Sequence, residues 1–133
     1  MAAIDLGELA RRHGVRLLLQ FGSTVSGVVH ELSDVDLGIL LDDPSLSLDR
    51  YGALHADLQR LFPGRTIDLA LLNRADPLFL EQVTDRCRLL HGSDAELRRF
   101  RLYAFKRYQD HRKYLDLERR FVARAVGAPT PRG

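Results

Sequence analysis

The sequence predicts an α/β (α+β) domain with a small mixed sheet, flanking helices and a long C-terminal helix. Short apolar runs alternate with segments of helical periodicity, as expected for strands packed between helices. Glycine, proline or aspartate separates most of these segments. The last periodic segment runs from 93 to about 126 without a breaker. At 133 residues the chain can bury its own core, so we expect a single domain over 1–133, with its main body over about 15–95.

Each element has its own sequence signal, and strands are expected where short apolar runs lie between turn residues. The expected elements are a helix over 3–13, a strand over 15–21, a short helix over 24–31, a strand over 35–41, a helix over 47–62, a strand over 66–72, a helix from 77 to about 86, an extended segment over 87–92 and a helix from 93 to about 126.

Helix boundaries are marked by capping residues. Gly14 is expected to end the first helix, and Asp76-Pro77 reads as an N-cap followed by proline in the first turn. Ser93 and Glu96 have the spacing of a capping box and are expected to open the long C-terminal helix. These signals divide the chain into alternating strands and helices.

The C-terminal helix combines an apolar face with many basic and aromatic residues. Its expected apolar stripe consists of Leu97, Phe100, Ala104, His111, Leu115 and Val122. Tyrosines 103, 108 and 114 lie among arginines and lysines, a composition found both at protein interfaces and on ordinary packed helices. The sequence leaves both readings open.

Charge is unevenly distributed along the chain. Residues 1–97 hold 9 Lys or Arg and 15 Asp or Glu, whereas residues 98–133 hold 11 Lys or Arg and 3 Asp or Glu. A basic tail is typical of a chain that meets an acidic protein or nucleic acid, and equally of a helix that complements its own acidic body. Direct binding of nucleic acid therefore remains an open alternative.

Cysteine content and hydropathy indicate a cytoplasmic protein. Cys87 is the single cysteine, so an internal disulfide is excluded and no zinc-ligand spacing exists. The N-terminal segment contains Asp5 and Glu8 and lacks the long apolar run of a signal peptide or a membrane span. We expect no membrane association.

Three aspartates stand in or beside strands where carboxylates are costly to place. Asp34 and Asp36 are two residues apart at the start of a strand, so their side chains point to the same face. Asp68 lies within the next apolar strand, "TIDLALL". Clustered carboxylates repel each other unless a cation lies between them, and Mg²⁺ prefers oxygen ligands. If the two strands are neighbours, the sequence predicts a three-carboxylate site for two divalent metal ions.

A glycine–serine turn precedes these aspartates. Gly22 and Ser23 follow an apolar strand and come before a possible helix start, where backbone N–H groups can face a phosphate. The spacing Gly-Ser, ten residues, Asp-x-Asp is far more specific than either dipeptide alone.

This pattern resembles the signature of the minimal nucleotidyltransferases of the DNA polymerase beta superfamily. The resemblance covers about 15–95, and the small domain with its helical tail is most similar to MntA-like antitoxins, which pair with HEPN-domain RNase toxins. It implies the nucleotidyltransferase fold, with Gly22 and Ser23 holding nucleotide phosphates. It also implies that Asp34 and Asp36 bind metal and that Asp68 ligates a metal and helps deprotonate the attacking hydroxyl.

The resemblance implies an antitoxin that transfers AMP from ATP–Mg²⁺, with two ions, to a tyrosine of its HEPN-domain toxin in a hetero-oligomer. One segment departs from the family pattern, because "TVSG" at 24–27 has Ser26 where many relatives have arginine. Arg65 or Arg74 is a candidate replacement. The departure keeps a second hypothesis open, namely an antitoxin that neutralises its toxin by binding alone. Transfer to a small molecule is a third, but it would require a larger acceptor domain.

Overall fold

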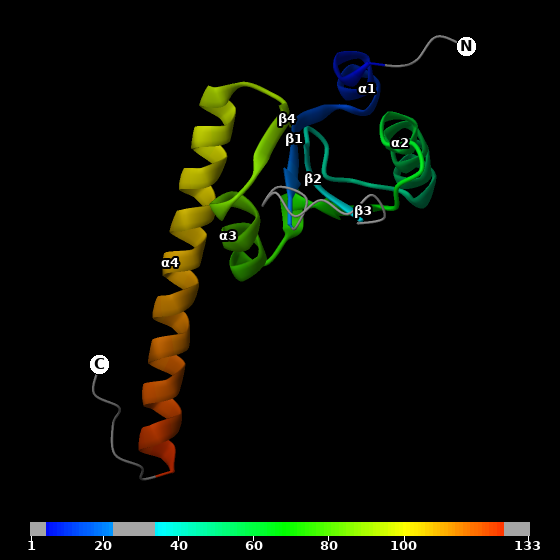
Figure 1. Ribbon diagram of the computed structural model, residues 1–133. Coiled ribbons are helices and arrows are strands. Elements are labelled where there is room, and N and C mark those ends of the chain that lie inside the picture. Colours follow the sequence, from blue (N-terminus) through cyan, green and yellow to red (C-terminus); the bar gives the residue numbers. More distant parts are fainter. Residues whose placement is uncertain (1–4, 23–33, 127–133) are drawn as a thin grey trace.

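The structure is a computed structural model that describes residues 5–22 and 34–126 (Figure 1). The elements in chain order are α1 (Leu6–His13), β1 (Val15–Phe21), β2 (Val35–Leu41), α2 (Leu48–Leu61), β3 (Ile67–Leu71), the 3-10 helix η1 (Leu72–Arg74), α3 (Pro77–Asp85), β4 (Arg88–His91) and α4 (Asp94–Ala125). The expected α/β arrangement is confirmed, with most bounds within two residues of expectation. The helix expected over 24–31 lies outside the described residues.

The four strands form one mixed sheet in the order β3-β2-β1-β4. β1 pairs antiparallel with β2 and with β4, whereas β2 and β3 run parallel. The parallel pair requires a crossover between its two strands, and α2 supplies it. β2 and β3 therefore begin at the same end of the sheet.

Helices cover both faces of the sheet (Figure 1). α1 and α2 pack on one face through Leu9, Ala10, Leu54 and Leu58, against inward-facing residues of β2 such as Leu37. α3 and α4 pack on the other face. That second core consists of Leu17, Leu19, Leu72, Leu80, Val83, Leu97, Phe100 and Ala104. The alternation of side chains along each strand divides the apolar residues between the two cores.

The expected capping residues begin the helices. Asp76 Oδ1 accepts a hydrogen bond from the N–H of Phe79 at 2.9 Å, and Ser93 Oγ accepts one from the N–H of Glu96 at 3.0 Å. The carboxylate of Glu96 lies 3.7 Å from Arg99 and 3.9 Å from Arg16. The serine cap is therefore confirmed, and the glutamate of the predicted capping box forms ion pairs.

The third strand ends one residue earlier than the sequence suggests. Leu72 opens the short helix η1, and Asn73 then turns back toward the end of β2. Its side-chain oxygen accepts from the N–H of Leu41 at 2.8 Å, and its side-chain nitrogen donates to the carbonyl of Leu41 at 2.9 Å. One amide side chain thus satisfies the backbone groups that another strand residue would have paired.

The apolar stripe of α4 enters the core over only part of its length. Leu97, Phe100 and Ala104 are buried as expected. Leu115 and Val122 are 37% and 52% exposed, so the predicted apolar stripe is packed in the first half of the helix and exposed in the second. Figure 1 shows that this half extends away from the sheet, where nothing described covers it. No helix of the described residues is both long and apolar enough to cross a membrane.

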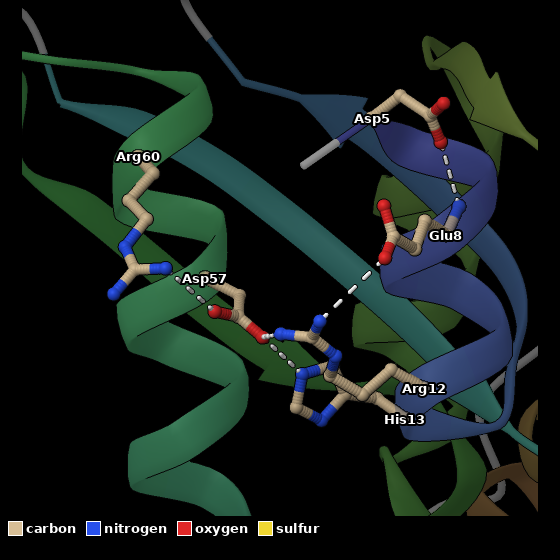
Figure 2. A network of polar contacts seen from close by, with 6 residues as sticks. All are labelled: Asp5, Glu8, Arg12, His13, Asp57 and Arg60. Carbon is tan, nitrogen blue, oxygen red and sulfur yellow. Dashed lines mark hydrogen bonds and ion pairs between the residues drawn. The ribbon is translucent and has the colours of Figure 1, made fainter. Parts of the chain in front are cut away.

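A polar network joins α1 to α2 on the first face (Figure 2). His13 Nε2 donates to Asp57 Oδ2 at 2.6 Å, and Arg12 lies 3.4 Å from the same oxygen. Arg60 is 3.7 Å from the other oxygen. The side chains of His13 and Asp57 are only 11% and 10% exposed. The bond from His13, followed by the neighbouring positive charges, holds the pKa of Asp57 below its usual range.

We expect Asp57→Asn to lower the free energy of unfolding by about 1–3 kcal/mol, because it weakens a largely buried charge-assisted contact. The pKa of Asp57 is lower in the folded chain than in the unfolded chain. Its stabilisation is therefore complete above the ordinary value of 3.8 and is lost as the pH falls through the folded-state pKa. Urea unfolding at several pH values measures both effects.

The control is Asp116→Asn, which removes an exposed pair with Arg120 on α4 and should cost at most about 0.5 kcal/mol. A difference between wild type and Asp57→Asn that stays constant from about pH 5 to pH 2 would contradict the assigned role.

Candidate active site

The candidate site lies at the end of the sheet where β2 and β3 begin. In the parallel pairing Asp36 is directly opposite Asp68, and in the antiparallel pairing Asp36 is opposite Phe21. Asp34 immediately precedes β2. The two strands that carry the predicted aspartates are therefore adjacent and in register, and residues distant in sequence meet on three neighbouring strands.

Alternation along β2 decides which face carries the carboxylates. Val35, Leu37 and Ile39 are fully buried against α1 and α2. The residues between them point to the opposite face, where α3 and α4 pack, so Asp36 shares a face with Leu40. Asp36 is half-buried, whereas Asp34 and Asp68 are exposed. The site is open to solvent at the edge of the covered face.

The electrostatics of the site are those of crowded negative charge. Partial burial raises the pKa of Asp36, and the nearby carboxylates of Asp68 and then Asp34 raise it further. Each of these effects disfavours the ionised form of Asp36. A bound cation would reverse all three, because it would replace lost hydration and offset the mutual repulsion.

Gly22 brings the backbone of β1 directly against Asp36. The residue follows Phe21 with φ of 81°, a left-handed conformation that L side chains rarely adopt. A Cβ atom at this position would overlap Asp36 Oδ2. Two features therefore favour glycine at this position: the left-handed backbone conformation and the close contact with the Asp36 carboxylate.

The residues present fit a divalent metal in chemical type and lie at one end of the sheet, although their side chains are not gathered around a single point. Within 5–22 and 34–126, no group of three or more His, Cys, Asp or Glu side chains is close enough to hold an ion. The in-register pair Asp36 and Asp68, with Asp34 beside it, supplies the oxygen ligands that Mg²⁺ prefers. Partial burial and the nearby carboxylates, which together raise the pKa of Asp36, are the observations that favour a cation here.

Part of the predicted nucleotide site lies outside the described residues. Ser23 and the "TVSG" segment over 24–27 belong to this part, so the predicted phosphate contact of Ser23 stays a prediction. Arg65 precedes β3, at the end of the sheet where Asp68 lies, whereas Arg74 follows β3 at the opposite end. Of the two candidate replacements for the missing arginine, Arg65 has the better position along the strand.

An aromatic pair beside the carboxylates was not singled out from the sequence. Phe21 and Phe79 make an edge-to-face contact with ring centroids 5.7 Å apart. Phe21 pairs with Asp36, so the two rings lie beside the acidic cluster and connect α3 to this end of β1. Only the pairing register of β1 with β2 could have revealed this proximity.

Comparison with known proteins gives the chain its family. The family model described as Polymerase beta, Nucleotidyltransferase matches residues 6–96, which is more than half of the chain. The chain belongs to this family and is a nucleotidyltransferase. None of the curated proteins matches it.

Several solved structures resemble the chain over nearly its whole length. A toxin–antitoxin with AMP-PNP is 26% identical, with a TM-score of 0.69, and the match covers 92% of this chain and 96% of that one. An MntA–HpeT complex with two aspartates changed to glutamate is 23% identical, with a TM-score of 0.68 and coverage of 96% and 100%. A tri-AMPylated HEPN toxin in complex with its MNT antitoxin, from Shewanella oneidensis, is 23% identical with a TM-score of 0.63. The match covers 92% of this chain and 93% of that one. The nucleotidyltransferase fold is thereby confirmed.

We expect Gly22→Ala to abolish most nucleotidyl transfer, because the new methyl group must displace the Asp36 carboxylate. The matched control is Gly64→Ala. Gly64 has nearly the same φ, 76°, but nothing lies within 4 Å of a Cβ built there. Both variants should lose about 1–2 kcal/mol of stability from backbone strain alone.

Transfer is measured with labelled ATP, and stability by chemical denaturation. Gly64→Ala should keep near wild-type transfer at temperatures where it is folded. Equal activity of the two folded variants would show that the Gly22–Asp36 contact has no role in the reaction.

Proposed function

We propose that this chain is the antitoxin of a HEPN/MNT toxin–antitoxin pair and transfers AMP from ATP to a tyrosine hydroxyl of its toxin. The observation that carries the proposal is the in-register placement of Asp36 and Asp68 beside Gly22, in a chain of the polymerase beta family. The similarity to a toxin–antitoxin with AMP-PNP, and to the complex that contains a tri-AMPylated HEPN toxin, supports the nucleotide and the partner.

Asp34, Asp36 and Asp68 are the residues that would hold Mg²⁺, and two ions are expected. When bound, Mg²⁺ offsets the negative charge of the triphosphate and orients it for in-line displacement. Gly22 would contact the phosphates through its backbone N–H at the end of β1, and Ser23 would add a hydroxyl contact. Arg65 is our candidate for the cation that relatives place after the serine.

The chain itself contributes mainly position and proton transfer. The tyrosine oxygen forms a bond to the α-phosphorus, the bond from that phosphorus to the bridging oxygen breaks, and pyrophosphate leaves. The phenolic proton passes to the carboxylate of Asp68, which is exposed and therefore accessible to an incoming hydroxyl. The half-buried Asp36 is less accessible to the acceptor.

A macromolecular acceptor fits the fold better than a small one. The sheet, α1, α2, α3 and the first half of α4 are used to build the two cores. The second half of α4 is a single helix and cannot enclose a small substrate. We therefore rank transfer to a small molecule below transfer to a protein.

A second candidate function is neutralisation of the toxin by binding alone. It is favoured by the "TVSG" segment, which lacks the arginine found in many relatives. Under this hypothesis the aspartates are dispensable for protection, although the fold and the contact surface are not.

The deciding experiment compares wild type with Asp36→Ala, using a HEPN-domain partner protein, to be sought in the adjoining reading frame, and labelled ATP with Mg²⁺. Wild type should label the partner, and Asp36→Ala should reduce labelling at least about a hundredfold, because a central charged group of the site is lost. Asp85→Ala, a change of an exposed aspartate at the end of α3, should label normally.

Equal labelling by wild type and Asp36→Ala would overturn the proposed chemistry. Protection of cells by an Asp34→Ala, Asp36→Ala double variant that labels nothing would instead establish neutralisation by binding. A phosphoamino-acid analysis of the labelled partner identifies the acceptor, and label on a residue other than tyrosine would correct that part of the proposal.

A further inference from the structure

The second half of α4 exposes a large apolar surface. α4 spans 32 residues, but its buried side chains end at Ala104, near the limit of α3 and the sheet. Arg107 still donates to the carbonyl of Ala75, and the last part of the helix projects from the rest of the chain (Figure 1). Projecting helices of this composition normally have a partner, because an exposed apolar stripe is unfavourable in water.

Five side chains define what we call the α4 surface. They are Tyr114, Leu115, Leu117, Phe121 and Val122, with exposed fractions of 64%, 37%, 63%, 73% and 52%. Positions i, i+3 and i+7 share one side of a helix, so Tyr114, Leu117 and Phe121 form one ridge. Leu115 and Val122 lie about three and five turns after Ala104, so they continue the face that packs in the core.

Basic residues flank this surface. Residues 105–125 contain seven Lys or Arg and three Asp or Glu. One of the acids, Asp116, is already paired with Arg120 at 3.2 Å within the helix. The apolar surface therefore lies on a positively charged segment, and a complementary partner presents acidic side chains around an apolar stripe.

Two other partners, a second copy of this chain and nucleic acid, fit the α4 surface less well. Pairing of two α4 helices from two copies of this chain would bring two positive segments together, which opposes self-association. Nucleic acid would satisfy the basic residues but would leave the leucine, valine and phenylalanine side chains of the α4 surface largely without an apolar partner. Aromatic residues surrounded by arginine are typical of protein interfaces.

We propose that the α4 surface docks an α-helix of the partner protein, one with an apolar stripe and acidic flanks. This inference rests on the proposed function for the identity of the partner, and it assigns the contact to a part of the chain separate from the carboxylates. Docking along α4 holds the acceptor protein while its hydroxyl enters the site at the start of β2.

The test measures binding of the HEPN-domain partner used in the labelling experiment to full-length variants. Leu117→Glu with Phe121→Glu should weaken binding at least about tenfold, because two central apolar contacts become charged. Leu102→Glu is the matched control. Leu102 is 68% exposed on the same helix but lies about 22 Å before Leu117 along the helix axis, outside the α4 surface, so binding should stay within about twofold.

All variants should melt as wild type does, since the substituted side chains are exposed. Affinity for the partner should fall with added salt, and an affinity independent of salt would overturn the acidic character of the docking helix. Wild-type binding by the Leu117→Glu, Phe121→Glu variant would overturn the surface itself. A dimer of the chain alone that this variant dissociates would assign the surface to a second copy and overturn the proposal.

Asp36→Ala separates this inference from the proposed function. That variant should bind the partner with wild-type affinity while failing to label it. If wild type binds through the α4 surface without labelling, the chemistry fails and the docking surface stands. If wild type labels the partner while the α4 substitutions leave both binding and labelling unchanged, the docking surface fails and the chemistry stands.

Discussion

The parallel pairing of β2 with β3 is the constraint on which the site depends. It places Asp36 opposite Asp68, and a shift of one residue would turn one of the two carboxylates to the opposite face. The register is held by the apolar residues around them, because Val35, Leu37 and Ile67 must remain buried against α1 and α2. Burial of these residues in the core on one face of the sheet thus sets the positions of the carboxylates on the opposite face. The α1–α2 network around Asp57 strengthens the same arrangement, since α2 is the crossover between the two strands.

This arrangement places three carboxylates close together at one end of the sheet, which is electrostatically unfavourable. Partial burial of Asp36 raises its pKa, and repulsion from Asp68 and then Asp34 raises it further. Such strain is common where a chain is prepared for a ligand of opposite charge. Here Gly22 increases the crowding, because the absence of a side chain lets the backbone of β1 approach Asp36 closely. The crowding at this end of the sheet therefore depends on what the chain leaves out as much as on what it supplies.

Much of this could be read from the sequence, for physical reasons. The strands were predictable because apolar runs this short fit strands better than helices, and the aspartates stood out because carboxylates are costly in such runs. The adjacency of β2 and β3 remained conditional, since no local signal specifies strand order. The extent of the packed part of α4 was also beyond prediction. Leu97 and Leu115 occupy equivalent positions in the pattern, and only the length of α3 and of the sheet decides that one is buried and the other exposed. The early end of β3 had a signal, Asn73, but its meaning depended on the nearby backbone of Leu41.

That contact has a consequence for mutational tolerance. The amide of Asn73 stands in for a peptide unit, so its two ends are not interchangeable: one must accept and the other must donate. An aspartate there would keep the shape almost unchanged but would set an anionic oxygen against the carbonyl of Leu41. The chain passes at this residue from the sheet toward the layer formed by α3 and α4, so loss of a single N–H donor would weaken the attachment of η1 to the end of β2. Isosteric replacement at Asn73 is therefore less conservative than many larger changes on the surface.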